Sequence, residues 1–68
     1  MKISARNAIS GKVVEIKTGA TTAHVRIDVG GTVVTASITN EAVEDLALEV
    51  GDDVRAIIKA SDVMVAKG

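Results

Sequence analysis

The fold is decided by residues 22–38, which read TAHVRIDVGGTVVTASI. Over residues 22–29 apolar and polar side chains alternate strictly, which is typical of a strand with one buried face. The pair Gly30-Gly31 accepts the positive φ angles of a tight hairpin turn. Residues 32–38 are predicted to form the returning strand. Its buried face comprises Val34, Ala36 and Ile38.

Three further strands and one helix are predicted around this hairpin. Residues 11–17 are rich in β-branched side chains and form the first strand, while residues 54–59 and 63–66 form the last two. Residues 40–47 break the two-residue period and predict a helix of about two turns. This order predicts an all-β fold, a small five-stranded OB-type Greek-key barrel with one short helix between strands three and four.

The size and composition of the chain predict one small domain over residues 1–68 that assembles into an oligomer. The chain has no cysteine, so neither disulfides nor zinc-thiolate sites stabilise its core. Hydrophobic residues make up 47% of it, a high share for a domain of this size. Burial between subunits accounts best for this surplus. A monomer with a core of Val, Ala and Ile stays open as the alternative.

Several function classes are disfavoured by what the chain lacks. A net charge of −1 and the complete absence of aromatic residues argue against nucleic acid as a partner, because single strands bind through cations and stacked rings. No apolar run approaches the length of a membrane span, and the N-terminus does not resemble a signal peptide. We therefore expect a cytoplasmic protein with neither nucleic acid nor membrane as a partner.

Catalytic and metal-binding residues are not expected either. The single histidine, His24, lies on the polar side of its predicted strand, and no cysteine is present as a nucleophile. Glu44 and Asp45 are adjacent on the predicted helix, so their carboxylates do not face each other. The chain therefore predicts no enzyme and no side chains that ligate a metal directly.

Two short polar boxes at opposite ends of the chain point to anion binding instead. Each combines a cation with small or hydroxyl side chains, which together supply compact hydrogen-bond donors for an oxyanion. The boxes are Ser4-Ala5-Arg6-Asn7 and Lys59-Ala60-Ser61-Asp62. The alternative is that both are ordinary polar loops.

A third candidate is Ser37-Ile38-Thr39-Asn40, which leads into the predicted helix. A hydroxyl beside the free N–H groups of a first helical turn can help to hold an anion. The alternative is simple capping, in which Thr39 or Asn40 accepts from those N–H groups without any ligand.

Four motifs in this order resemble the molybdate-binding Mop family over the whole chain. They are SARN at residues 4–7, GKV at 11–13, SIT at 37–39 and IKASDVMV at 58–65. The chain resembles the molbindins, which consist of a single domain of the type also called TOBE. The resemblance implies an OB-type barrel, a homo-oligomer in the form of a hexamer built as a trimer of dimers, and an oxyanion ligand, molybdate or tungstate, with no organic cofactor.

The resemblance also implies which residues bind the oxyanion. One subunit contributes the side chains of Ser4 and Arg6 and, largely through the backbone, Ala5 and Asn7. The neighbouring subunit contributes Lys59, Ala60, Ser61 and Thr39. Relatives often carry serine where this chain has Ala42 and Ala60, so two hydroxyl donors are missing here.

The resulting hypothesis is a protein that binds molybdate or tungstate between subunits for intracellular storage, buffering or delivery. Two alternatives stay open from the residues. One is a non-catalytic OB module that binds nucleic acid, and the other is a module that serves only oligomerisation.

Overall fold

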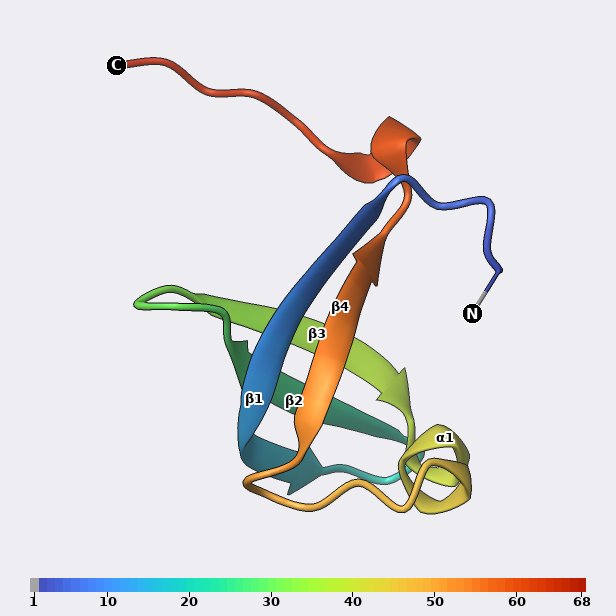
Figure 1. Ribbon diagram of the computed structural model, residues 1–68. Helices are drawn as coiled ribbons and strands as arrows, with labels where there is room; N and C mark the ends of the chain where they lie inside the picture. The colour runs from blue at the N-terminus through green and yellow to red at the C-terminus, as the bar shows by residue number, and fades with distance from the viewer. Residues whose placement is uncertain (1) are drawn as a thin grey trace.

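Strands β2 (Thr22–Asp28) and β3 (Val33–Thr39) form the predicted hairpin in the computed structural model, which describes residues 2–68 (Figure 1). Val25 lies opposite Ala36, and the alternating residues of β2 are buried as predicted. β2 ends one residue earlier than predicted, and β3 begins and ends one residue later than predicted. The hairpin prediction is therefore confirmed.

The hairpin turn is held by its own aspartate. Gly30 and Gly31 both have positive φ angles, and their backbone N–H groups donate to the Asp28 carboxylate at 2.9 and 3.1 Å. The bonds from Gly30 and then Gly31 hold the pKa of Asp28 below its usual value, because they favour the charged carboxylate.

Strand β1 (Asn7–Thr18) begins at Asn7 rather than at residue 11 as predicted. Its first half pairs with β4 (Asp53–Ile58), and its second half pairs with β2, with a bulge between Val13 and Glu15. The sequence pattern does not predict the first half of β1. Its pairing partner, β4, lies far away in the sequence, and no alternation of apolar and polar residues marks this half.

Gly11 lies where β1 passes from one partner strand to the other. A Cβ at this position would lie 2.6 Å from Ile27 Cγ2 and 2.7 Å from the Asp28 carbonyl oxygen. Atoms cannot approach so closely, so the crossing of β1 over β2 requires glycine at this point.

Helix α1 (Asn40–Asp45) is shorter than the predicted range 40–47. Thr39 is its N-cap, and the Thr39 hydroxyl accepts from the Ala42 N–H at 3.0 Å, which confirms one of the two predicted caps. Ala47 has a φ of 49°, so the chain leaves the helical conformation before it. Val43 packs against the core, whereas Leu46 is 66% exposed.

The strand order in the sheet is β3-β2-β1-β4, which confirms the Greek-key connection. β3 and β4 are both edge strands and do not pair with each other. Among residues 2–68 there are four strands rather than five, so a single chain forms an open, curled sheet instead of the predicted closed barrel. The buried core is correspondingly small. It consists of Val13, Ala23, Val25, Ile27 and Ala56.

The predicted fifth strand, residues 63–66, does not form. A short 3₁₀ turn, η1 (Ala60–Asp62), follows β4, and the chain then runs away from the sheet (Figure 1). Met64 and Val65 are each 93% exposed. The physical reason is that a strand needs a neighbouring strand for its backbone hydrogen bonds, and this segment has none among residues 2–68.

Candidate functional site

The two polar boxes lie next to each other within one chain. Asn7 is opposite Ile58 at the end of the β1–β4 pair, and the Asn7 side-chain amide donates to the Ile58 carbonyl at 3.1 Å. Residues 4–6 therefore precede this last pair, and residues 59–61 follow it. Figure 1 shows the N-terminal segment and η1 at the same end of the molecule.

The cations of this end are exposed and carry no ion pair with any residue of the range 2–68. Arg6 and Lys59 are both exposed, while Ala5 and Asn7 are half-buried. Within residues 2–68 the ion pairs join Lys12 to Asp53 and, at a longer distance, Arg26 to Glu15. Neither cation of the two boxes is neutralised by these pairs, so both charges are available to an anionic ligand.

The second box also presents backbone donors. In η1 the Asp62 N–H donates to the Lys59 carbonyl at 2.9 Å, and the Val63 N–H donates to the Ala60 carbonyl at 3.2 Å. In the part of the chain that the structure describes, the N–H groups of Ala60 and Ser61 donate to no protein acceptor. The exposed Ser61 hydroxyl adds a third neutral donor beside them.

Thr39 does not join these boxes in the same chain. It ends β3 opposite Thr22, near the far end of β1, where Thr18 pairs with Ala23. Asn7 lies at the other end of this twelve-residue strand. The Thr39 oxygen accepts a hydrogen bond, so its hydroxyl proton is still free to donate. Thr39 can therefore reach the two boxes only if it comes from another copy.

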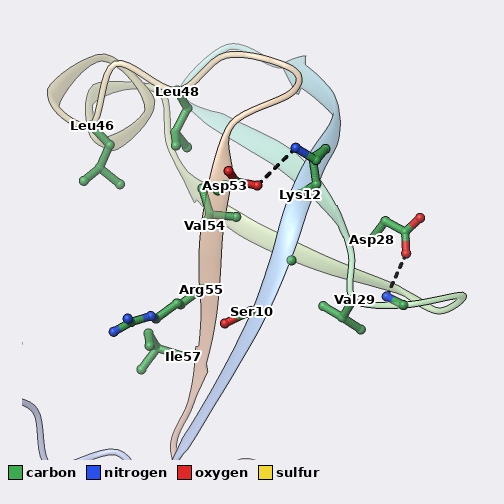
Figure 2. Close-up of a pocket in the computed structure, with 12 residues that line it drawn as sticks. Ser10, Lys12, Asp28, Val29, Leu46, Leu48, Asp53, Val54, Arg55 and Ile57 are labelled. Carbon is green, nitrogen blue, oxygen red and sulfur yellow. Dashed lines mark hydrogen bonds and ion pairs between the residues drawn. The ribbon is translucent and has the colours of Figure 1, made fainter.

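A wide groove of about 1040 Å³ that sequence reasoning missed lies beside β4. Figure 2 shows Arg55 and Ile57 on β4, Ser10 on β1, and Leu46 and Leu48 beyond α1. The Lys12 ammonium at this groove is held by Asp53 at 3.1 Å and by the Gly51 carbonyl at 3.3 Å. Because the lining residues come from four separate segments, no sequence motif marks the groove.

Neither a metal centre nor a membrane span appears among the described residues. Within residues 2–68 no three His, Cys, Asp or Glu side chains are grouped so that they could hold a metal ion. No helix there is long and apolar enough to cross a membrane.

Comparison with known proteins decides the family. Residues 3–65 match the model of the TOBE domain family. This chain belongs to the TOBE domain family. A probable molybdenum-pterin-binding protein of Haemophilus influenzae is 53% identical to this TOBE domain over 66 residues, which cover 96% of each chain. The predicted resemblance to the Mop family is thereby confirmed.

Solved structures show that this TOBE domain shares its fold with molybdate-binding proteins. A molybdate-binding protein from Sporomusa ovata superimposes with a TM-score of 0.95 at 43% identity, over 98% of this chain and 100% of that one. The cytoplasmic molybdate-binding protein ModG, solved with molybdate bound, superimposes with a TM-score of 0.89 at 43% identity. That match covers 94% of this chain and 46% of ModG.

Proposed function

We propose that this TOBE domain binds molybdate at a site shared between copies of the chain. One copy contributes Ser4, Ala5, Arg6 and Asn7, and another contributes Lys59, Ala60 and Ser61. Thr39 lies at the opposite end of its own chain from both boxes, so it comes from a further copy. The observation that carries anion binding is the pairing of Asn7 with Ile58, which brings both polar boxes of a chain to one end of its sheet. The names of the relatives support molybdate as the ligand.

The charges at this end of the sheet suit a dianion. Molybdate is a tetrahedral oxyanion with two negative charges, and its burial is costly unless charge and hydrogen bonds are both satisfied. Arg6 and Lys59 supply two positive charges that are unpaired within residues 2–68. The N–H groups of Ala60 and Ser61 supply neutral donors. Tungstate has the same charge and shape, so we propose that it binds as well.

Two features support a site between copies rather than within one. Thr39 lies at the far end of β1 from the boxes, so a site that includes Thr39 needs a second chain. The exposed apolar residues Met64 and Val65 also favour association. We propose the hexamer, a trimer of dimers, as the binding form. The closed five-stranded barrel is likewise proposed for the assembled form, with residues 1–68 as one domain.

The proposed role is storage, buffering or delivery of the oxyanion in the cytoplasm, without chemistry on the ligand and without an organic cofactor. The missing hydroxyls at Ala42 and Ala60 reduce the number of donors. The Ala42 N–H donates to the Thr39 hydroxyl oxygen, so it does not replace the missing hydroxyl at residue 42. The Ala60 N–H has no acceptor within the described residues and so compensates in part for the missing side-chain hydroxyl.

Calorimetric titration tests this function. We expect saturable heat with molybdate and tungstate, and far weaker binding of sulfate and phosphate. Arg6→Ala should weaken molybdate binding by roughly a hundredfold, because it removes charged hydrogen bonds. Arg26→Ala is the matched control, since it removes the same side chain from the outer face of β2. Absence of heat with molybdate and tungstate would contradict the proposal and favour a module that serves only oligomerisation.

A further inference from the structure

The last pair of the β1–β4 ladder carries a side-chain hydrogen bond. The Asn7 side-chain amide donates to the Ile58 carbonyl at 3.1 Å, and both residues are half-buried. The bond spans 51 positions of the chain, more than any other side-chain hydrogen bond within residues 2–68. Asn7 therefore fastens the first polar box to the strand that leads into the second.

Electrostatic repulsion acts just beyond this pair. The β1–β4 ladder ends where Asn7 lies opposite Ile58. The next position of this antiparallel register would place Arg6 opposite Lys59, and like charges at opposite positions destabilise a strand pair. Neither cation has a carboxylate partner within residues 2–68. The strand ends that carry the two boxes therefore repel each other, and the Asn7 hydrogen bond opposes their separation.

The Ile58 carbonyl is a point from which the second box can be oriented. It belongs to the planar peptide unit that continues into Lys59, so a donor held on this carbonyl fixes the plane of that unit. The direction in which the chain enters η1 follows from this plane. The N–H groups of Ala60 and Ser61, which have no acceptor within the described residues, come directly after it. The Asn7 side chain thus sets where these donors point.

We propose that Asn7 is a positioning residue for oxyanion binding, and that its side chain acts on the second box of its own chain. The inference rests on the proposed function, in which the two boxes of one chain face different oxyanions. The Asn7 backbone belongs to one of these sites, whereas its side chain orders residues 59–61 for the other. Donors that are ordered in advance lose less entropy on binding, so the bond strengthens binding at a site that Asn7 does not touch.

Calorimetry with molybdate on the complete chain gives the first comparison. Asn7→Ala should weaken binding by roughly fivefold to tenfold, the equivalent of one net hydrogen bond and the repulsion it opposes. Lys12→Met is the matched control, because Lys12 bonds β1 to the other end of β4, at Asp53 and at the Gly51 carbonyl. It should leave molybdate affinity unchanged. Equal binding by Asn7→Ala and the natural chain would overturn the positioning role while the proposed function stands.

Complementation separates positioning from direct contact with the ligand. When Arg6→Ala and Lys59→Ala copies are refolded together, a restored site takes its first box from the Lys59→Ala copy and its second from the Arg6→Ala copy. Asn7→Ala is then added to the Arg6→Ala copy alone, so the altered residue lies outside the restored site. Binding should still weaken, by roughly threefold, because the second box loses its support. The effect is smaller here since Arg6→Ala already removes the repulsion.

A loss in the complete chain that disappears in this mixture would overturn the proposal, because Asn7 would then act only on its own box. A mixture that restores no site would overturn the assignment of the two boxes to different sites. Absence of molybdate binding by the natural chain would remove the proposed function and the positioning role together.

Nuclear magnetic resonance tests the hydrogen bond itself without any oxyanion. The backbone nitrogen resonance of a residue responds to hydrogen bonding at the preceding carbonyl, so Asn7→Ala should shift the Lys59 nitrogen resonance. Lys12→Met should leave that resonance in place. An unshifted Lys59 resonance in folded Asn7→Ala would show that the Ile58 carbonyl is not held by Asn7, and would overturn the inference whatever calorimetry finds.

Discussion

The hairpin and the end of the sheet that carries the polar boxes differ in how fully their polar and apolar groups are satisfied within the chain. At the hairpin end, the Asp28 carboxylate satisfies the N–H groups of Gly30 and Gly31, and the residues of β2 that face inward are buried. At the end where β1 begins and β4 ends, Arg6 and Lys59 carry no ion pair within residues 2–68, and Met64 and Val65 lie in solvent.

This difference separates what one chain provides from what an assembly provides. A segment whose polar groups are hydrogen-bonded and whose apolar side chains are buried within its own chain is stable without a ligand or a partner. Free cations, free backbone donors and an apolar segment gathered at one end are the features expected of a surface that becomes buried on binding. The hairpin therefore stabilises the fold, whereas the end with the two polar boxes has the features on which the proposed site rests.

The largest expected effect is at Gly11, which belongs to the complete part of the molecule. Gly11→Ala places a Cβ 2.6 Å from Ile27 Cγ2 and should destabilise the chain by about 3 kcal/mol. Urea denaturation followed by far-ultraviolet circular dichroism measures this. Gly19→Ala is the control, because its nearest neighbour is the Thr22 carbonyl oxygen at 3.1 Å. Equal losses in the two variants would show that the crossing at Gly11 is not tight.

Substitution of valine by alanine at Val25 in the hairpin and at Val65 in the C-terminal segment compares the two regions directly. Val25 is 2% exposed, so Val25→Ala should cost about 2 kcal/mol at any protein concentration. Val65→Ala should leave a dilute, dissociated chain unchanged and lower the melting temperature only where the protein is assembled. Thermal melts across a range of protein concentrations check this. A loss at Val65 that does not depend on concentration would mean that the segment packs on its own chain.

Thr39 tests whether one residue serves both the fold and the ligand. Thr39→Val removes the oxygen that accepts from the Ala42 N–H and should cost about 1 kcal/mol of stability. It should also weaken molybdate binding, because the donor proton is lost. Thr39→Ser keeps the hydroxyl and should preserve both properties in denaturation and calorimetry. If Thr39→Val weakened only the fold, Thr39 would be a cap and not a ligand residue.

The smallest expected effect is the pH dependence of the hairpin turn. The pKa of Asp28 is lowered in the folded chain, so its contribution is present above the unfolded value of about 3.9 and is lost as pH falls through the folded value. Asp28→Asn should therefore reduce the loss of stability between pH 6 and acid pH. Urea midpoints at several pH values measure it. An unchanged acid response in Asp28→Asn would assign that response to other carboxylates.

How far the sequence predicts the fold depends on where each pairing partner lies. Alternation over residues 22–38 predicts the hairpin because the two strands are neighbours in the chain. The start of β1 at Asn7 was missed because its partner, Ile58, lies fifty-one residues away. The segment 63–66 has a strand-forming sequence, yet no strand forms without a partner in the same chain.

How far the sequence predicts the candidate site also depends on which of its residues are neighbours in the chain. Composition alone indicates that the two boxes can bind an anion, but the adjacency of Asn7 and Ile58 is a tertiary contact that composition does not contain. The separation of Thr39 from the boxes likewise appears only once the register of β2 against β3 is known. The groove beside β4 has no sequence signal, because its lining comes from separate segments.

The most direct test of the account is complementation between two variants that are each deficient in binding. Arg6→Ala and Lys59→Ala are mixed, unfolded together, refolded and titrated with molybdate in the calorimeter. A site shared between copies predicts that binding returns at roughly one quarter of the natural stoichiometry, because random pairing makes half of the pairs mixed and restores one of two sites in each. No recovery, with both variants folded and assembled, would contradict a shared site.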